Sequence, residues 1–241
     1  MKLIEVNTYE ELSLQAANIV ANQINRKPRS VLGLATGSTP LGCYQELVRL
    51  YQNGELDFSE VTTFNLDEYY GLGPEDHNSY RYYMDHFFFD HINIKKSATH
   101  IPQGIPQDVL AECQAYDALA SQMGGMDLQI LGLGTTGHIA FNEPDSTFHP
   151  FTRLVNLDES TIQANGHYFK HKNDIPRQAL TVGMRFILNS RLILLLASSE
   201  KKAMALERTL KGPVDPLVPA SILQLHPNVI IIADDLARSM L

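Results

Sequence analysis

The stretch Met126–Pro144, with the sequence MDLQILGLGTTGHIAFNEP, decides the fold that this chain can adopt. Its first half is rich in leucine and isoleucine over residues 128–133, which predicts a strand buried on both faces, as in a parallel sheet. Gly134 and Gly137 then permit the backbone angles of a tight turn. The stretch therefore predicts a strand that ends in a turn, and ligands of parallel α/β sheets bind at such strand ends.

A histidine and a carboxylate follow this strand end. His138 comes directly after the turn, and Glu143 lies further along, inside Asn-Glu-Pro. Both side chains are placed to meet a substrate and also each other. The alternative is a turn histidine that only satisfies backbone groups, and the stretch by itself leaves both interpretations open.

Composition excludes several classes of protein. The chain has 241 residues, of which 44% are hydrophobic, and a net charge of -8, so it is globular and unsuited to nonspecific nucleic-acid binding. No apolar run approaches the ~20 residues that a membrane span needs, and the acidic start lacks the features of a signal peptide. Cys43 and Cys113 show no metal spacing and indicate free thiols in a reducing compartment. We therefore expect a cytoplasmic protein that binds neither nucleic acid nor membrane.

Helical and strand-like segments alternate along the chain. The spacing predicts helices over 9–24, 40–50, 79–91, 109–123, 181–189 and 219–225, and strands over 31–34, 61–66, 128–133, 192–197 and 229–233. This alternation predicts a single Rossmann-like three-layer α/β domain over residues 1–241, with a mostly parallel sheet and helices on both faces. Residues 147–172 are irregular and polar, which is typical of a lid or binding loop, and we assign that role to 145–175.

Two further strand ends carry polar residues. Residues 35–40 read Ala-Thr-Gly-Ser-Thr-Pro between a strand and a helix, an arrangement that binds phosphate through backbone N–H groups, hydroxyls and the helix dipole. The alternative is an ordinary capped turn. Asp67 and Glu68 are adjacent carboxylates at the end of the 61–66 strand; one is placed to act on a substrate while the other orients a partner. A solvated pair in a loop is the other interpretation.

Six motifs in colinear order span almost the whole chain: LGLATGSTP (32–40), FNLDEYYGL (64–72), GHIAFNEP (137–144), ALTVGM (179–184), KAMAL (202–206) and ILQLHPNV (222–229). With them the sequence resembles the glucosamine-6-phosphate deaminase (isomerase) family. The Phe-Asn-Glu-Pro after Gly-His separates this family from the similarly folded 6-phosphogluconolactonases.

The resemblance implies an aldose–ketose isomerisation of an amino sugar phosphate that releases ammonia, without a cofactor. It assigns the proton transfer between C2 and C1 to Asp67 and ring opening to His138, which Glu143 orients. Residue Thr136 stands at a fourth catalytic position. The substrate-binding residues that we expect are Thr36, Gly37, Ser38, Thr39, Glu68, Gly137, His167 and Lys202.

The chain departs from the family pattern in several places. Thr136 stands where an Asp or Asn usually supports the catalytic histidine, and His167 stands where an Arg usually grips the phosphate. Ser-Ser-Glu-Lys precedes Lys202, where a Ser-Gly turn is usual. Longer allosteric members have a C-terminal extension and a Lys in place of Val155, so we do not expect regulation by N-acetylglucosamine 6-phosphate.

These departures leave three hypotheses. The chain is a glucosamine-6-phosphate deaminase, or it performs the same chemistry on another phosphosugar such as galactosamine 6-phosphate, or it is a non-catalytic sugar-phosphate-binding regulator. In each case we expect a small-molecule sugar phosphate as the partner, no metal, and a monomer or a small homo-oligomer. Arg153 and Lys170 are alternatives to His167 for binding the phosphate.

Overall fold

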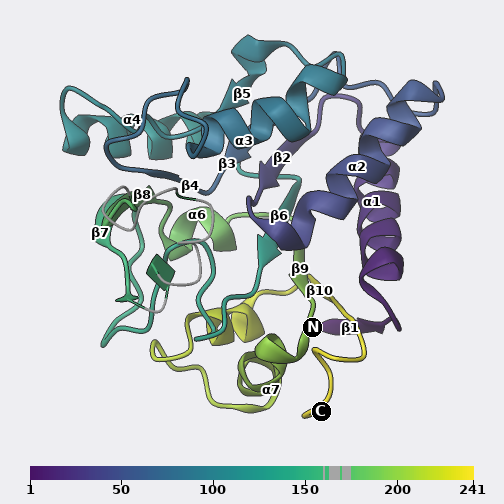
Figure 1. Cartoon of the computed structure of the whole chain (residues 1–241), viewed down its shortest axis with the longest axis vertical. Helices are drawn as coiled ribbons and strands as arrows, with labels where there is room; N and C mark the ends of the chain where they lie inside the picture. The colour runs from purple at the N-terminus through teal and green to yellow at the C-terminus, as the bar shows by residue number, and fades with distance from the viewer. Residues whose placement is uncertain (160, 163–168, 170–174) are drawn as a thin grey trace.

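The computed structural model describes residues 1–159, 161–162, 169 and 175–241. Seven strands form a central sheet in the order β1-β10-β9-β6-β2-β3-β5 (Figure 1), and every neighbouring pair of them is parallel. These strands are β1 (Lys2–Glu5), β2 (Val31–Leu34), β3 (Thr62–Asn65), β5 (Thr99–His100), β6 (Leu128–Gly132), β9 (Ile193–Ala197) and β10 (Val229–Ala233). The predicted α/β class with a mostly parallel sheet is confirmed.

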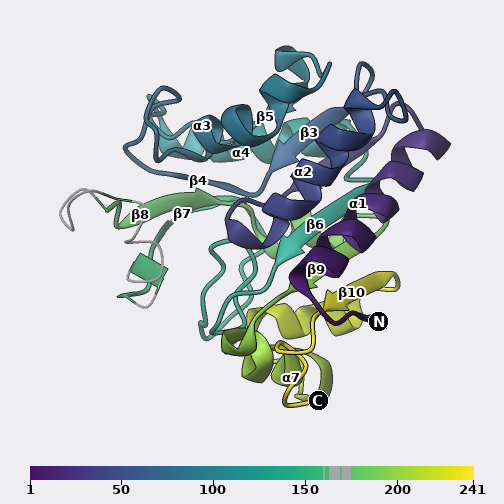
Figure 2. The same cartoon turned by 45° about the vertical axis from the view of Figure 1, so that its right-hand side comes forward.

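Helices cover both faces of this sheet. They are α1 (Tyr9–Arg26), α2 (Ser38–Gln52), α3 (Tyr80–Phe87), α4 (Val109–Gln122), α6 (Met184–Leu188) and α7 (Ala203–Lys211), with a 3-10 helix at Pro219–Leu225. Because crossovers between parallel strands are right-handed, the strand order places α1, α2 and α3 on one face and the later helices on the other. Figure 2 shows α1 and α2 side by side across the first of these faces.

The direction in which the chain crosses the sheet reverses between β2 and β6. From β2 the chain continues outward to β3 and β5, whereas from β6 it continues the opposite way to β9 and β10. The loops after β2 and β6 therefore leave toward opposite faces and open a crevice at the carboxyl ends of the strands. Ligands of doubly wound sheets bind at such a crevice, so the loops that start at Ala35 and Leu133 border the expected site.

A second, antiparallel sheet packs beside this edge. Its order is β4-β8-β7, formed by β4 (Asp67–Tyr69), β8 (Gln178–Thr181) and β7 (Arg153–Asn156). The region 147–172, predicted to be irregular, contains β7, so that prediction was wrong in part. The helix predicted over 181–189 is present as the shorter α6, and β8 ends at Thr181, where the helix was predicted to begin.

The physical reason is that β7 and β8 form strands because they pair with each other, and their own sequences do not indicate strands. β7 has no buried residue and no apolar run, while β8 pairs along both of its edges. Such pairing depends on contacts that are distant in sequence, and local periodicity does not report it. The helix predicted over 79–91 is shorter than expected. It ends before Phe88, and residues 89–91 form a 3-10 turn.

The main core lies between the central sheet and its helices. All residues of β9 are at most 1% exposed, as a strand covered on both faces requires. A smaller apolar cluster lies under the antiparallel sheet, formed by Tyr69, Phe141, Leu157, Ile162, Phe169 and Ala179. No helix in the described part of the chain is long and apolar enough to cross a membrane.

Candidate active site

The turn after β6 brings His138, Glu143 and Thr136 together. His138 Nδ1 lies 3.0 Å from Glu143 Oε2 and 2.9 Å from Thr136 Oγ1. The hydroxyl of Thr136 also donates to Glu143 Oε2, at 3.4 Å. The carboxylate and the hydroxyl next to Nδ1 favour the neutral form of the ring that carries its proton on Nδ1. In this form Nε2 has no proton and can accept one from a ligand. The predicted meeting of the histidine and the carboxylate is therefore present.

Thr161 is a partner of this pair that the sequence did not reveal. Its hydroxyl donates a short hydrogen bond to Glu143 Oε1, so the two carboxylate oxygens of Glu143 have different partners. Burial opposes the charged form of Glu143, but the hydrogen bonds from His138 and Thr161 and the His138 charge outweigh it and lower the pKa of Glu143. Glu143 is therefore an anion at neutral pH. Thr161 lies 18 residues from Glu143 in the chain, and no local motif connects them.

Two glycines of the turn make room for this arrangement. A Cβ atom on Gly134 would lie 2.2 Å from His138 Nε2, so only glycine allows the imidazole to rest against this backbone. Gly137 has φ +83°, a left-handed conformation that suits glycine, and a Cβ there would lie 2.8 Å from Val218 Cγ1. Gly137, predicted to bind substrate, thus also shapes the backbone that leads into His138.

Asp67 begins β4, directly beyond the end of β3. The residue is only 6% exposed. Burial, together with the charge of the neighbouring Glu68, raises the pKa of Asp67 to about 8. A carboxyl group with a pKa near the working pH is suited to both accept and return a proton. The predicted solvated alternative for Asp67 is wrong, because strand pairing with β8 buries this residue.

Glu68 has a structural role that adjacency to Asp67 did not indicate. Its Oε1 accepts hydrogen bonds from the backbone N–H groups of Tyr69 and Tyr80, each at 2.8 Å, and its Oε2 accepts one from Arg81 N at 2.9 Å. The carboxylate therefore anchors the N-terminus of α3, where a negative charge is favourable. Burial nevertheless raises the pKa of Glu68 to about 7.

The loop after β2 has the features of an anion site. Helix α2 begins without a side-chain cap and without an acidic residue in its first turn, so its first N–H groups remain available. Gly37 has φ +93° and open space where a Cβ would lie. Tyr83 and Tyr9 hold the carbonyl oxygens of Gly37 and Ser38 through their hydroxyls, at 2.7 and 2.8 Å. The side chains of Thr36, Ser38 and Thr39 stand on this constrained loop.

Tyr80 connects the anion loop to Asp67. A hydrogen bond joins the side chains of Tyr80 and Thr36, and burial, Tyr69 and Asp67 together raise the pKa of the Tyr80 hydroxyl well above its usual range. Tyr80 therefore interacts with both the loop after β2 and the carboxyl group after β3.

The structure describes only some of the remaining residues that were predicted to bind phosphate. Lys202 lies in the 3-10 turn Glu200–Lys202 after β9, at the same edge of the sheet. Its ammonium has no ion-pair partner among the described residues. His167 and its alternative Lys170 lie outside the described residues. Arg153, the other alternative, donates to Asn142 Oδ1 at 2.9 Å.

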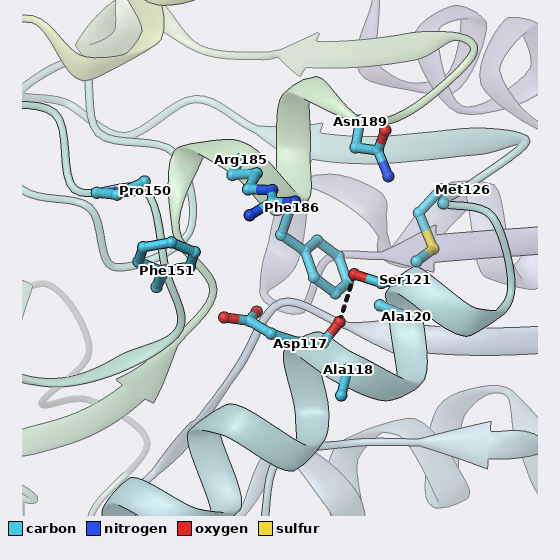
Figure 3. A pocket seen from close by; sticks show the side chains of 11 residues that line it. Asp117, Ala118, Ala120, Ser121, Met126, Pro150, Phe151, Arg185, Phe186 and Asn189 are labelled. Atoms are coloured by element: carbon cyan, nitrogen blue, oxygen red, sulfur yellow. Dashed lines mark hydrogen bonds between the residues drawn. The ribbon is translucent and has the colours of Figure 1, made fainter.

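Two cavities lie apart from His138, Glu143 and Asp67. One, of about 120 Å³, is bounded by α4, α6 and the segment before β7; Figure 3 shows Asp117, Phe151 and Arg185 around it. The other, of about 490 Å³, is lined by Glu68 and His100 among other residues. Neither cavity contains His138, Glu143 or Asp67. Within the described residues, no group of three or more His, Cys, Asp or Glu side chains is arranged to hold a metal ion.

Comparison with known proteins identifies the family. The profile of the family described as glucosamine-6-phosphate isomerases/6-phosphogluconolactonase matches residues 6–231. The chain belongs to this family. The resemblance inferred from the six motifs is thereby confirmed.

Relatives within the family include curated and solved proteins. The glucosamine-6-phosphate deaminase of Halothermothrix orenii is 56% identical over 99% of both chains. That of Thermoanaerobacter pseudethanolicus is 52% identical over 100% of this chain and 95% of its own. A solved structure, described as a monomeric glucosamine-6-phosphate deaminase, is 48% identical over 100% of both chains, with a TM-score of 0.98.

The lactonase branch of the family shares the fold alone. A 6-phosphogluconolactonase structure from Thermotoga maritima has a TM-score of 0.77 over 97% of this chain but only 18% identity. This chain is far more similar in sequence to the deaminases than to this lactonase. The GHIAFNEP motif likewise indicates the deaminase branch. The fold by itself supports either chemistry.

Proposed function

We propose that this chain converts glucosamine 6-phosphate and water into fructose 6-phosphate and ammonia. The observation that carries the proposal is the contact between His138 and Glu143, supported by the raised pKa of Asp67 and the uncapped start of α2, each of which follows the carboxyl end of a central strand. Curated relatives with about half of their residues identical, over nearly the whole chain, bear the name of this activity. The site contains one carboxyl group for proton transfer, one histidine–carboxylate pair and one anion-binding loop, as this reaction requires.

The first step opens the pyranose ring. His138 Nε2 takes the proton of the C1 hydroxyl, and the imidazolium that forms returns a proton to the ring oxygen as the C1 aldehyde appears. Glu143 stabilises this imidazolium because its carboxylate lies 3.0 Å from Nδ1. Thr136 and Thr161 hold the carboxylate in place through their hydroxyls.

The second step moves a proton along the sugar. Asp67 takes the proton from C2, which the neighbouring aldehyde acidifies, and delivers it to C1, while a proton of the amino group passes to O1, so that C1 becomes an alcohol. The amine at C2 then becomes an imine, and water adds to the imine to release ammonia and the ketose. The cationic amino group of the substrate favours the charged form of Asp67 in the complex, which counteracts the raised pKa of the free protein. Because the release consumes water, the overall deamination is hydrolytic.

The other features of the proposal follow from the substrate. A sugar phosphate is charged and stays inside the cell, so we place the reaction in the cytoplasm, within amino sugar catabolism. The chain acts as a single domain and a monomer, supported by the solved relative described as monomeric. Within 145–175, the segment expected to act as a lid or active-site loop, Thr161 contacts Glu143, whereas residues 160, 163–168 and 170–174 lie outside the described residues.

An ammonia-release assay tests the proposal. The purified chain is incubated with glucosamine 6-phosphate, galactosamine 6-phosphate and unphosphorylated glucosamine, and ammonia and ketose are measured separately. We expect both products in equal amounts from glucosamine 6-phosphate only. Turnover that favours galactosamine 6-phosphate would contradict the substrate assignment. Tight binding of glucosamine 6-phosphate without any turnover would instead identify a regulator.

A further inference from the structure

The turn after β9 has a backbone conformation that side chains ordinarily prevent. Ser199 has φ 82° and ψ 152°, a region that is occupied almost only by glycine because a Cβ atom is crowded there. Among the described non-glycine residues, Ala140 alone shares a positive φ. The surrounding structure must therefore hold Ser199 in place.

Asp234, directly after β10, supplies the holding contacts. The residue is 4% exposed. Its Oδ2 accepts a hydrogen bond from Ser198 Oγ, and both of its carboxylate oxygens lie 3.2 Å from the backbone nitrogen of Ser199. Its Oδ1 also accepts from Ala237 N at 2.8 Å. One buried carboxylate thus ties the turn after β9 to the chain after β10.

The same turn carries Lys202. The carbonyl oxygen of Ser199 accepts a hydrogen bond from Lys202 N at 3.0 Å, so the position of the lysine backbone depends on the conformation of Ser199. Burial, with Lys201 nearby, lowers the pKa of the Lys202 ammonium. No described residue pairs with this partly buried charge, and an unpaired buried charge is unfavourable until an anion arrives. The Lys202 ammonium on this turn is therefore suited to bind an anion.

We infer that Asp234 is a positioning residue for the substrate phosphate: by holding Ser199 in its unusual conformation, it fixes Lys202 where the phosphate binds. The inference rests on the proposed function and on the expectation that Lys202 binds the substrate phosphate. It also explains how this chain uses a serine at a position where its backbone geometry suits glycine. The alternative is that Asp234 only stabilises the chain after β10. In that case the position of Lys202 would not change when Asp234 is replaced.

Steady-state kinetics of Asp234→Asn separate these two roles. Asparagine keeps the shape but loses the charge and one of the two acceptor oxygens. We expect the KM for glucosamine 6-phosphate to rise roughly tenfold, as for a weakened hydrogen bond to a charged group, with kcat nearly unchanged. Asp235→Asn is the matched control, because the Asp235 side chain is 60% exposed and pairs with Arg238. A parental KM in Asp234→Asn, or a loss confined to kcat, would overturn the inference.

A second substitution tests the conformational part of the inference. Glycine adopts the Ser199 conformation without help, so Ser199→Gly introduced into Asp234→Asn should return the KM most of the way to the parental value. A merely destabilised protein would not recover in this way, because Ser199→Gly adds no contact. If the double variant keeps the raised KM of Asp234→Asn, Asp234 does not act through Ser199.

Binding of inorganic phosphate, measured by titration calorimetry, separates this inference from the proposed function. We expect Asp234→Asn and Lys202→Ala each to weaken phosphate binding relative to the parent. If the parent releases no ammonia from any hexosamine phosphate, the proposed function fails, yet weakened phosphate binding in Asp234→Asn still supports the positioning role. Equal phosphate affinity in the parent and Asp234→Asn overturns the inference, whatever the activity.

Discussion

His138 Nδ1 lies 3.0 Å from Glu143 Oε2, and the two residues meet because a Gly-rich turn folds the chain back on itself after β6. The contact holds one imidazole nitrogen and leaves Nε2 for the substrate. It also supplies the negative charge that an imidazolium needs in a half-buried site. Thr136 and Thr161 complete the surroundings of the carboxylate.

We predict that Asp67→Asn abolishes ammonia release while binding of the phosphosugar persists. Asparagine keeps the shape of Asp67 but cannot accept the C2 proton, and general acid–base catalysis is worth roughly 10²–10⁴-fold. Turnover is measured by ammonia release and binding by calorimetry. A variant that releases ammonia at near the parental rate would show that Asp67 is not the proton shuttle.

The same substitution should stabilise the protein above mildly acidic pH. The pKa of Asp67 is raised to about 8 in the folded chain, from an ordinary value of 3.8. Between these values the unfolded chain releases the proton while the folded chain retains it, so this residue lowers stability as pH rises. Urea unfolding at pH 5 and pH 8 should show that Asp67→Asn gains more stability at pH 8. An equal gain at both values would mean that Asp67 titrates normally.

We predict that Gly134→Ala lowers kcat by about 10²-fold, the loss expected when a catalytic group moves by about 1 Å. The new Cβ would lie 2.2 Å from His138 Nε2, so the ring must move. Gly132→Ala is the matched control, since a Cβ there meets no atom within 4 Å. Both variants are compared by kcat and by thermal unfolding. Equal activities of the two variants would contradict the close approach of His138.

Thr136→Asp should preserve or raise kcat. The Thr136 hydroxyl lies 2.9 Å from His138 Nδ1 but brings no charge. A carboxylate at this position adds negative charge beside the imidazolium that forms during ring opening. The rate of ring opening and kcat are measured for the parent and the variant. A Thr136→Asp variant much slower than the parent would show that the uncharged side chain serves another purpose.

Thr161→Val should move the acid limb of the pH–rate profile to higher pH. The Thr161 hydrogen bond helps to keep the pKa of Glu143 low, so its loss raises that pKa, and Glu143 then takes up a proton at a higher pH. A carboxyl group whose pKa is lowered in the folded protein stabilises the fold at pH values above its ordinary pKa. The stability due to Glu143 is therefore lost as the pH falls. Thr161→Ser keeps the donor and should retain the parental profile. Identical profiles for Val and Ser would exclude this coupling.

Local motifs in the sequence locate most of the site. Asp67, His138 and Glu143 are each predicted from a strand end followed by a polar turn, and His138 and Glu143 are indeed in contact. The predicted contact is present because both residues follow strand β6 closely in the sequence. A local pattern therefore carries the information about their position.

Other members of the site depend on contacts between distant segments. Thr161 reaches Glu143 from another part of the chain, and Asp234 reaches Ser199 from the end of the neighbouring strand of the sheet. Glu68 stays a predicted substrate-binding residue, and only the tertiary structure shows that its oxygens accept hydrogen bonds from the start of α3. The strands β7 and β8 were missed for the same reason, because each is formed by pairing with the other.

The sequence by itself determined the α/β class and the family, and it predicted the edge of the sheet at which ligands bind. These features follow from hydrophobic periodicity, glycine turns and short motifs, all of which act within a few residues. Only the tertiary structure decided which groups hold the catalytic side chains and which charges are buried. Burial and long-range hydrogen bonds set these properties, as the raised pKa of Asp67 and the unusual backbone of Ser199 show.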